Sequence, residues 1–261
     1  MQLPLTFHER LRSARTPQVG LWVCSGSATC AELVAGSGCD WVLVDGEHSP
    51  IGLESILGML RTIAASDVAP VVRVPVLDTA LIKQYLDLGA QNIMVPMVHT
   101  PDAAAQAVAA MHYPPRGVRG VGSALARSSR WNRVPNYLQH ASDTVSLTVQ
   151  IESAEAVRNA HAIAATDGVD AVFIGPADLA ADMGFIGQQD HPEVIAAVER
   201  AIAAAHAVGI PVGVNAFAPA QQEHYLAAGA DFIAVGADVQ LLARSTTQLV
   251  EATRARGQQR G

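Results

Sequence analysis

The sequence lacks the features that mark secreted, membrane-bound or nucleic-acid-binding proteins. It has no run of about 18 apolar residues, so we expect no membrane-spanning segment, and its start, "MQLPLTFHERLRSARTP", lacks the apolar centre of a signal peptide. The net charge of −7 argues against a nucleic-acid partner. Cys24, Cys30 and Cys39 are odd in number and show no CxxC spacing, which predicts reduced thiols. These absences favour a soluble, cytoplasmic protein.

Charged residues are also scarce, at 16% of the chain, whereas half of the residues are hydrophobic. This composition supplies enough apolar material for one large core. A length of 261 residues is that of one α/β barrel, so it requires no second domain.

One local pattern recurs four times and indicates parallel strands covered by helices. A glycine, one further residue and then Asp or Gln precede a short apolar stretch, in "GCDWVLVD", "GAQNIMVP", "GVDAVFIG" and "GADFIAVG". Each glycine can end a helix, and each stretch is apolar on both faces, as buried parallel strands are. Further strands are expected at 18–24, 70–75, 145–152 and 211–215. This alternation predicts a single (β/α)8 TIM-barrel domain over residues 1–261, with a doubly wound open sheet as the alternative.

An arginine-rich loop, at about residues 113–144, interrupts the alternation. Its arginines are Arg116, Arg119, Arg127, Arg130 and Arg133. Two explanations stay open for such a basic segment in an acidic protein. The arginines make subunit contacts and pair with carboxylates, or they hold an anionic substrate near the mouth of the barrel.

Polar side chains stand where the predicted strands end, and in a barrel these ends surround the active site. In chain order they are Asp45, Glu47, His48, Arg73, Gln150, Glu152 and Asp178. Alternation along the fifth strand points Gln150 and Glu152 into the barrel, because Val149 and Ile151 occupy the opposite face. Buried charges are costly unless they are paired or bind a cation. Each residue alone is explained by a structural ion pair, but together they favour a site.

Glu152 and Asp178 are candidate ligands of a divalent metal. Two carboxylates leave positions open for water and substrate, as suits Mg²⁺ or Mn²⁺. The motif "GPADL" looks like a helix start with Pro176 in its first turn, so free N–H groups near Ala177 and Asp178 could hold a substrate carboxylate. A small 2-oxo acid would then chelate the metal, which would stabilise an enolate.

An enolate mechanism needs a base, and His48 is the candidate because histidine exchanges protons near neutral pH. Asp45 could orient its ring and Arg73 could stabilise the developing oxyanion, although a loop histidine satisfied by local hydrogen bonds remains the alternative. A Schiff base would require Lys83, the single lysine of the chain. Lys83 lies on the polar side of a helix, four residues before Asp87, where a surface pair is expected. We therefore predict no Schiff-base lysine and no organic cofactor.

Long motifs resemble the metal-dependent (class II) pyruvate aldolases over about residues 20–244. These motifs are "VDGEHSP", "VVRVP", "IKQYLDLGAQNIMVPMV", "YPPRGVRGVGSALARSSRWNRVPNYL", "VQIES" and "DGVDAVFIGPADLAADMG". The resemblance implies a (β/α)8 barrel whose last helix swaps between subunits of a homohexamer. It also implies a divalent cation, Mg²⁺, Mn²⁺ or Co²⁺, and a cytoplasmic lyase of aromatic catabolism that acts on a small 2-oxo acid and an aldehyde.

The resemblance also assigns roles to individual residues. His48 would be the base and Arg73 the arginine that stabilises the transition state. Glu152 and Asp178 would bind the metal, and Gln150 and the backbone around Ala177 would contact the substrate. Asp87 would raise the basicity of the histidine, most easily across a subunit contact. The chain departs from the family at Asn215, in "VGVNAFAPAQQ", where an apolar side chain is expected near the aldehyde.

The activity implied by this resemblance is reversible retro-aldol cleavage of a 4-hydroxy-2-oxo acid. For a substrate of the 4-hydroxy-2-oxoheptanedioate type, the products would be pyruvate and succinic semialdehyde, formed through a metal-bound pyruvate enolate. A keto-deoxy sugar-acid aldolase is the alternative within the lyases. A metal-enolate isomerase or mutase is less favoured, and so is a non-catalytic binding protein, which has no need for a base, an arginine and a metal together.

Overall fold

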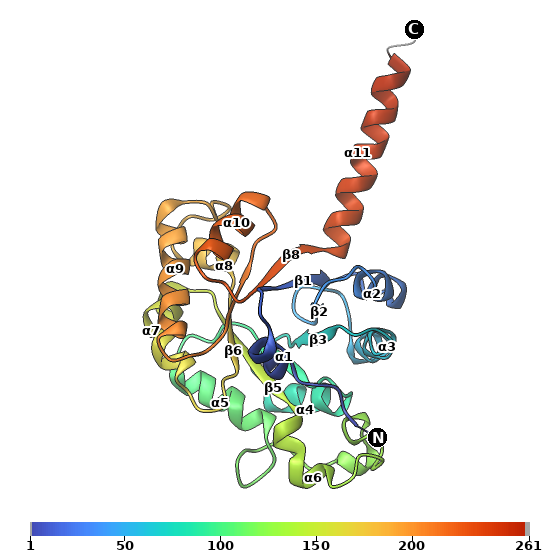
Figure 1. Ribbon diagram of the computed structural model, residues 1–261, viewed down its shortest axis with the longest axis vertical. Coiled ribbons are helices and arrows are strands. Elements are labelled where there is room, and N and C mark those ends of the chain that lie inside the picture. Colours follow the sequence, from blue (N-terminus) through green and yellow to red (C-terminus); the bar gives the residue numbers. More distant parts are fainter. Residues whose placement is uncertain (1, 259–261) are drawn as a thin grey trace.

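The computed structural model describes residues 2–258, and within them eight parallel strands form a closed barrel (Figure 1). The strands are β1 (Gln18–Val23), β2 (Trp41–Asp45), β3 (Ala69–Arg73), β4 (Asn92–Val95), β5 (Ser146–Ile151), β6 (Ala171–Ile174), β7 (Val212–Asn215) and β8 (Phe232–Ala237). Each strand pairs with the next, and β1 pairs with β8 through registers such as Val19 with Ile233. This closure confirms the predicted (β/α)8 barrel and excludes the open sheet.

Helices alternate with the strands and surround the barrel (Figure 1). They are α1 (Phe7–Ser13), α2 (Ala28–Ala35), α3 (Leu53–Ile63), α4 (Thr79–Asp87), α5 (Pro101–Met111), α6 (Tyr137–His140), α7 (Ala154–Ala164), α8 (Pro176–Asp182), α9 (Pro192–His206), α10 (Pro219–Ala227) and α11 (Asp238–Gln258). No helix among the described residues is long and apolar enough to span a membrane.

The recurring glycine pattern has a physical explanation in the turns that lead into the strands. The four glycines have positive φ angles of 87°, 89°, 94° and 101°, at Gly38, Gly89, Gly168 and Gly229. Side chains other than glycine rarely adopt this conformation. The aspartates that follow hold the start of a neighbouring strand through their carboxylates. Asp40 accepts the N–H of Val19, Asp170 that of Leu147 and Asp231 that of Val212. The pattern therefore forms the turn before a strand: Gly89 and Gly229 directly follow a helix C-cap, whereas Gly38 and Gly168 lie two and three residues beyond one.

Aromatic side chains fill the barrel interior. Trp41 and Phe232 meet edge to face with ring centroids 5.6 Å apart, and Phe7 of α1 packs on Phe232 at 5.2 Å from the N-terminal end. Gly20 and Gly213 make room for these rings, because a Cβ atom would lie 2.1 Å from Trp41 at Gly20 and 2.2 Å from Phe232 at Gly213. Since the interior is closed by packing, an active site has to lie above it, at the C-terminal ends of the strands.

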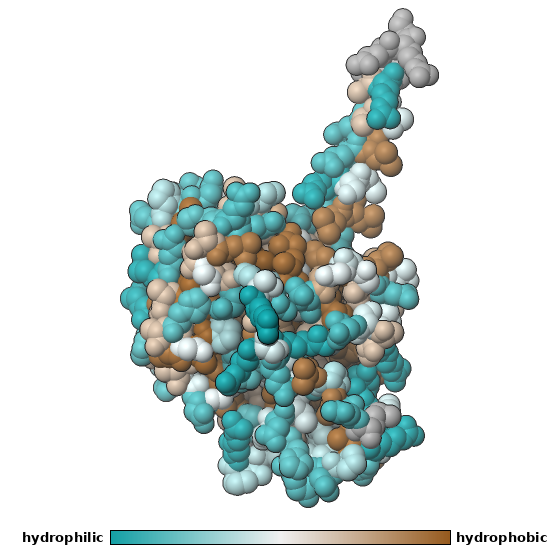
Figure 2. All heavy atoms as spheres, viewed as in Figure 1, coloured by the Kyte–Doolittle hydropathy of each residue, from teal (hydrophilic) through white to brown (hydrophobic). Residues whose placement is uncertain are grey.

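Helix α11 extends away from the barrel, and apolar side chains occur along it (Figures 1 and 2). Among them are the exposed Leu242, Leu249 and Val250. The arginine-rich loop contains three short 3-10 helices, η1 (Ser123–Leu125), η2 (Arg127–Ser129) and η3 (Ala141–Thr144), in addition to α6. It packs on α4, where Arg127 Nη1 donates to the Leu88 carbonyl at 3.1 Å. At least this arginine of the loop therefore makes a hydrogen bond within its own chain.

Candidate active site

The strand ends bring the predicted site residues to one end of the barrel. Asp45 and Arg73 are the last residues of β2 and β3 and are direct partners in the parallel register. Gln150 lies near the end of β5, and Glu152 follows that strand directly. These four side chains are buried, with at most 2% of each residue exposed. They form a polar layer above the apolar interior.

The guanidinium of Arg73 is the centre of this layer. Its Nε donates to Asp45 Oδ1 at 2.9 Å, and its Nη1 donates to Gln150 Oε1 at 3.4 Å. Nη1 also lies 2.9 Å from Glu47 Oε2, as an ion pair without the alignment of a hydrogen bond. Nη2 is buried and has no hydrogen-bond partner among the described residues. The two N–H donors on Nη2 are therefore unpartnered within the described chain.

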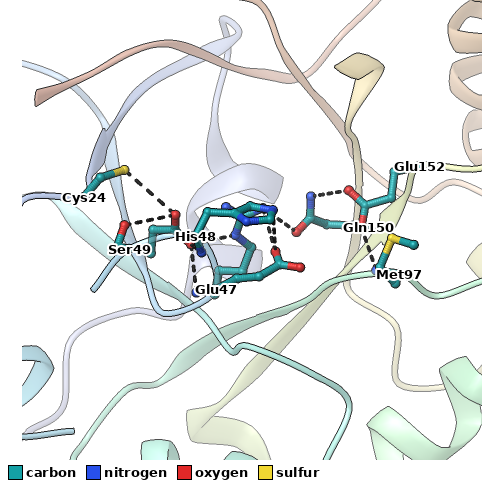
Figure 3. Close-up of polar contacts among 9 residues, drawn as sticks. Cys24, Glu47, His48, Ser49, Met97, Gln150 and Glu152 are labelled. Atoms are coloured by element: carbon teal, nitrogen blue, oxygen red, sulfur yellow. Dashed lines mark hydrogen bonds and ion pairs between the residues drawn. The ribbon is translucent and has the colours of Figure 1, made fainter. Parts of the chain in front are cut away.

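Asp45 supports the loop that carries His48. Burial alone would raise the pKa of Asp45, but the hydrogen bond and charge of Arg73 and the N–H groups of Glu47 and His48 lower it below its ordinary value. Its Oδ1 accepts those N–H groups at 3.0 and 3.4 Å, and its Oδ2 accepts the Ser49 hydroxyl at 3.2 Å (Figure 3). Asp45 thus binds the main chain of the His48 loop.

The His48 side chain lies at the rim of the site and is 66% exposed. Its Nε2 lies 3.9 Å from Glu47 Oε2, so Glu47 is the carboxylate near the ring (Figure 3). Burial raises the pKa of Glu47, while the charges of Arg73 and His48 oppose the shift. The position of His48 suits proton exchange with a ligand in the mouth of the barrel.

Glu152 is a buried carboxylate held on the opposite side of the site (Figure 3). Its Oε1 accepts the Met97 N–H at 2.6 Å, and its Oε2 accepts the Gln150 amide at 3.1 Å. Gly175 lets the backbone approach closely, since a Cβ atom there would lie 2.7 Å from Glu152 Oε2. Burial raises the pKa of Glu152 to about 7; the Met97 N–H opposes this shift and the charges of Asp178 and Glu47 reinforce it.

These carboxylates fit a divalent cation. Asp178 lies in the first turn of α8, three residues after Gly175, and is close enough to raise the pKa of Glu152 through its charge. The described residues contain no group of three or more His, Cys, Asp or Glu side chains arranged around one metal position. A pair of carboxylates with open positions filled by water and substrate is the oxygen-rich donor set that Mg²⁺ and Mn²⁺ accept. The cation would also offset the burial and the repulsion that together raise this pKa.

Three predicted site residues, Asp87, Asn215 and Ala177, lie outside the cluster around Arg73, and so does Lys83, for which no catalytic role was predicted. Asp87, at the end of α4, accepts from the buried Arg119 Nη2 at 2.8 Å. Lys83, on the same helix, lies near Gly120 of the arginine-rich loop, where a Cβ atom would be 3.3 Å from the lysine Cδ. Asn215 ends β7 and, together with Ala177, lines a cavity of about 680 Å³ at the C-terminal rim. Its Oδ1 is buried and has no hydrogen-bond partner among residues 2–258.

The sequence reasoning did not assign a role to Glu47 or Trp22. Glu47 forms an ion pair with Arg73. Its place between Asp45 and His48 in "DGEHSP" was the available signal in the sequence. Trp22 packs its ring against Arg73, with 4.4 Å from the guanidinium carbon to the ring centroid. An aromatic residue in an apolar strand carries no such signal.

The barrel carries a buried arginine, carboxylates and an exposed histidine at the ends of its strands. Together with comparisons to a family model, to known proteins and to solved structures, this site defines an enzyme of the carbon–carbon lyase class. The family model described as HpcH/HpaI aldolase/citrate lyase matches residues 18–245. A 4-hydroxy-2-oxo-heptane-1,7-dioate aldolase of Salmonella heidelberg (strain SL476) is 51% identical over 243 residues, covering 93% of this chain and 92% of that protein.

Two further relatives extend this similarity. A hydroxypyruvate/pyruvate aldolase of Deinococcus radiodurans is 51% identical over 244 residues, 94% of this chain and 88% of that protein. The crystal structure of an HpcH/HpaI aldolase/citrate lyase family protein from Burkholderia cenocepacia J2315 superposes with a TM-score of 0.91. It is 42% identical, over 95% of this chain and 98% of that chain. The chain belongs to the HpcH/HpaI aldolase/citrate lyase family.

The raised pKa of Glu152 leads to a prediction about metal affinity. A metal ligand has to be ionised, and a carboxyl with a pKa of about 7 is protonated below that pH. Mn²⁺ affinity should therefore fall about tenfold per pH unit below this pKa and level off above it. Calorimetric titration with Mn²⁺ between about pH 5.5 and 8.5 measures this.

Glu152→Gln is the control for this titration. It should bind Mn²⁺ weakly and lose this pH dependence, because the amide neither ionises nor carries charge. Equal Mn²⁺ affinity for the native protein on both sides of pH 7, or tight binding by the variant, would exclude Glu152 as the titrating ligand.

Proposed function

We propose that this protein catalyses the reversible retro-aldol cleavage of a 4-hydroxy-2-oxo acid to pyruvate and an aldehyde. The observation that carries the proposal is the buried Arg73, whose Nη2 is unpartnered among the described residues, between the acidic pair Glu152 and Asp178 and the exposed His48. The names of the two aldolases that are 51% identical support the same reaction type. The heptanedioate type of substrate is the first candidate.

The mechanism assigns one task to each side chain. His48 removes the proton of the C4 hydroxyl, directly or through water, and the C3–C4 bond breaks to release the aldehyde. The bond electrons pass to C3, which gives the enolate of pyruvate, and protonation at C3 completes pyruvate. Arg73 would donate from Nη2, which has no partner in the described chain, to the oxyanion that develops on the C2 oxygen. A divalent cation held by Glu152 and Asp178 would supply Lewis-acid polarisation of the 2-oxo group.

The pyruvate half of the substrate would be oriented by groups around β5 and α8. Gln150 donates one amide hydrogen to Glu152 and accepts from Arg73, so its position is fixed between the two charged groups. Helix α8 begins at Pro176, which leaves the N–H groups of Ala177 and Asp178 without partners inside the helix. These N–H groups are suited to a substrate carboxylate.

The aldehyde half would extend into the cavity lined by Asn215. The unpaired Oδ1 of Asn215 favours a second candidate, an aldolase for hydroxylated substrates such as keto-deoxy sugar acids. A hydroxyl on the substrate would donate to this oxygen, whereas the chain of succinic semialdehyde has no donor for it. This contact therefore distinguishes the two candidates.

Assembly with further copies of the chain is part of the proposal. The 21-residue helix α11 carries exposed leucines, and an apolar groove of about 410 Å³ lies at its base. The groove is lined by residues that include Leu21, Val34, Val239 and Leu242. We propose that α11 packs on a second subunit, as in the swapped homohexamer implied by the resemblance. Asp87 would then act near His48 of another copy, with Arg119 fixing its carboxylate.

The experiment that tests the function is a panel of 4-hydroxy-2-oxo acids scored by pyruvate formation with Mg²⁺, Mn²⁺ and Co²⁺. Cleavage should require a cation and should survive borohydride in the presence of pyruvate. Loss of activity with a covalent increase in mass after borohydride would indicate a Schiff base. If no substrate of the panel releases pyruvate with any of the metals, the proposed reaction is wrong.

His48→Ala should lower turnover by about 10²–10⁴-fold, the usual contribution of a general acid–base group. Mn²⁺ affinity should change little, because His48 is not a proposed ligand. His224→Ala is a matched control, since His224 is also an exposed histidine beside a glutamate, with its Nε2 2.9 Å from Glu199 Oε1. A His48→Ala enzyme with most of its turnover would require another base.

Asn215→Leu should lower kcat/KM for glycolaldehyde relative to succinic semialdehyde in the aldol direction. The variant removes the acceptor for a substrate hydroxyl, and an unpaired buried polar group costs about 1–3 kcal/mol, roughly 5- to 150-fold in relative rate. Gln221→Leu, in the same cavity wall, is the control for general changes in polarity. An unchanged ratio of the two rates would place Asn215 outside the aldehyde site.

A further inference from the structure

Trp22 connects the apolar interior to the charged layer. It lies on β1 and is half-buried, with its ring tilted against Phe173 at 6.4 Å and edge to face with Phe217 at 6.0 Å. The guanidinium of Arg73 lies over the same ring, with its central carbon 4.4 Å from the ring centroid. The indole therefore contacts both the aromatic interior and the guanidinium of Arg73.

The edge of the Arg73 guanidinium and its face are held in different ways. The edge is fixed by Asp45, Glu47 and Gln150, which engage Nε and Nη1 and leave Nη2 without a hydrogen-bond partner in the described chain. These partners determine the direction of the group within its plane. A flat cation also has to be fixed against rotation out of that plane, and a packed ring face does this without competing for the N–H groups.

The indole is suited to this task because tryptophan has the strongest cation–π attraction among the aromatic residues. Its own Nε1 is buried and has no hydrogen-bond partner among the described residues, so packing alone holds the ring. A polar neighbour in its place would engage Nη2. An aliphatic neighbour would fill the space without attracting the charge.

We propose that Trp22 is a positioning residue for the aldol reaction: its indole face fixes the plane of Arg73, so that Nη2 stays directed at the C2 oxygen of the substrate. This inference rests on the proposed function. Trp22 would affect the chemical step more than substrate binding, because Arg73 acts on charge that develops during the reaction.

The test compares variants that keep or remove the ring face, in the metal-loaded enzyme. Trp22→Leu should lower kcat about tenfold and change KM for the 2-oxo acid by less than about threefold. Trp22→Phe, which keeps an aromatic face, should retain at least about a third of the native kcat. Trp22→Met fills the space with a flexible apolar chain and serves as the second non-aromatic variant if Trp22→Leu does not fold.

Phe232→Leu is the control for loosened packing, because Phe232 belongs to the same aromatic interior, whereas the cation–π contact of Arg73 is with Trp22. It should lower the melting temperature at least as much as Trp22→Leu and leave kcat within about twofold. The decisive comparison is with Arg73→Lys, because a lysine has no plane to fix. In that background Trp22→Leu should lower the exchange of pyruvate methyl protons for deuterium by less than about twofold.

Three results would overturn the proposal. In the first, Trp22→Leu lowers proton exchange by the same factor in the native background and in the Arg73→Lys background. In the second, Trp22→Phe loses as much kcat as Trp22→Leu. In the third, Trp22→Leu raises KM and leaves kcat unchanged. A failure of the proposed function is distinguishable, because the native enzyme would then release no pyruvate from any 4-hydroxy-2-oxo acid.

Discussion

The buried guanidinium of Arg73 is the interaction on which the site depends. A single cation at the end of β3 faces three carboxylates, those of Asp45, Glu47 and Glu152, and it pairs with the first two. Asp45 stays ionised because of this pairing, and it holds the loop that presents His48. Glu152 lacks such a partner, and burial raises its pKa to about 7. This unequal charge supports the proposal that the site takes a second, exchangeable cation.

The barrel tolerates these buried charges because its apolar core and its charged layer occupy different levels of the fold. Its interior is filled by aromatic rings, and the glycines on β1 and β7 give those rings space. The charged layer therefore lies on a rigid apolar support, with Trp22 as the contact between the two layers. Residues at the strand ends line the surroundings of this layer, as Asn215 does at the end of β7.

Much of the scaffold could be predicted from the sequence, because its signals are local. The glycine pattern marks four turns before strands, two of them directly at a helix end, and the alternation along β5 agrees with the contacts that join Arg73, Gln150 and Glu152. The contacts of Glu47 and Trp22 could not be predicted, since both depend on how β1, β2 and β3 come together around Arg73. The partner of Asp87 is likewise distant in sequence, at Arg119 in the arginine-rich loop. The roles of His48, Asp87 and the metal ligands stay predictions.

The most direct measurement of the central claim separates Arg73 from the metal site. Arg73→Met removes the cation and keeps an apolar chain of similar length, and two quantities are measured: Mn²⁺ affinity and the exchange of pyruvate methyl protons for deuterium. We expect exchange to fall by about 10²–10³-fold, the usual effect of losing a donor to an oxyanion. Mn²⁺ affinity should hold or increase, because a positive charge near Glu152 is gone. Exchange within tenfold of the native rate, or the joint loss of metal binding, would contradict the account.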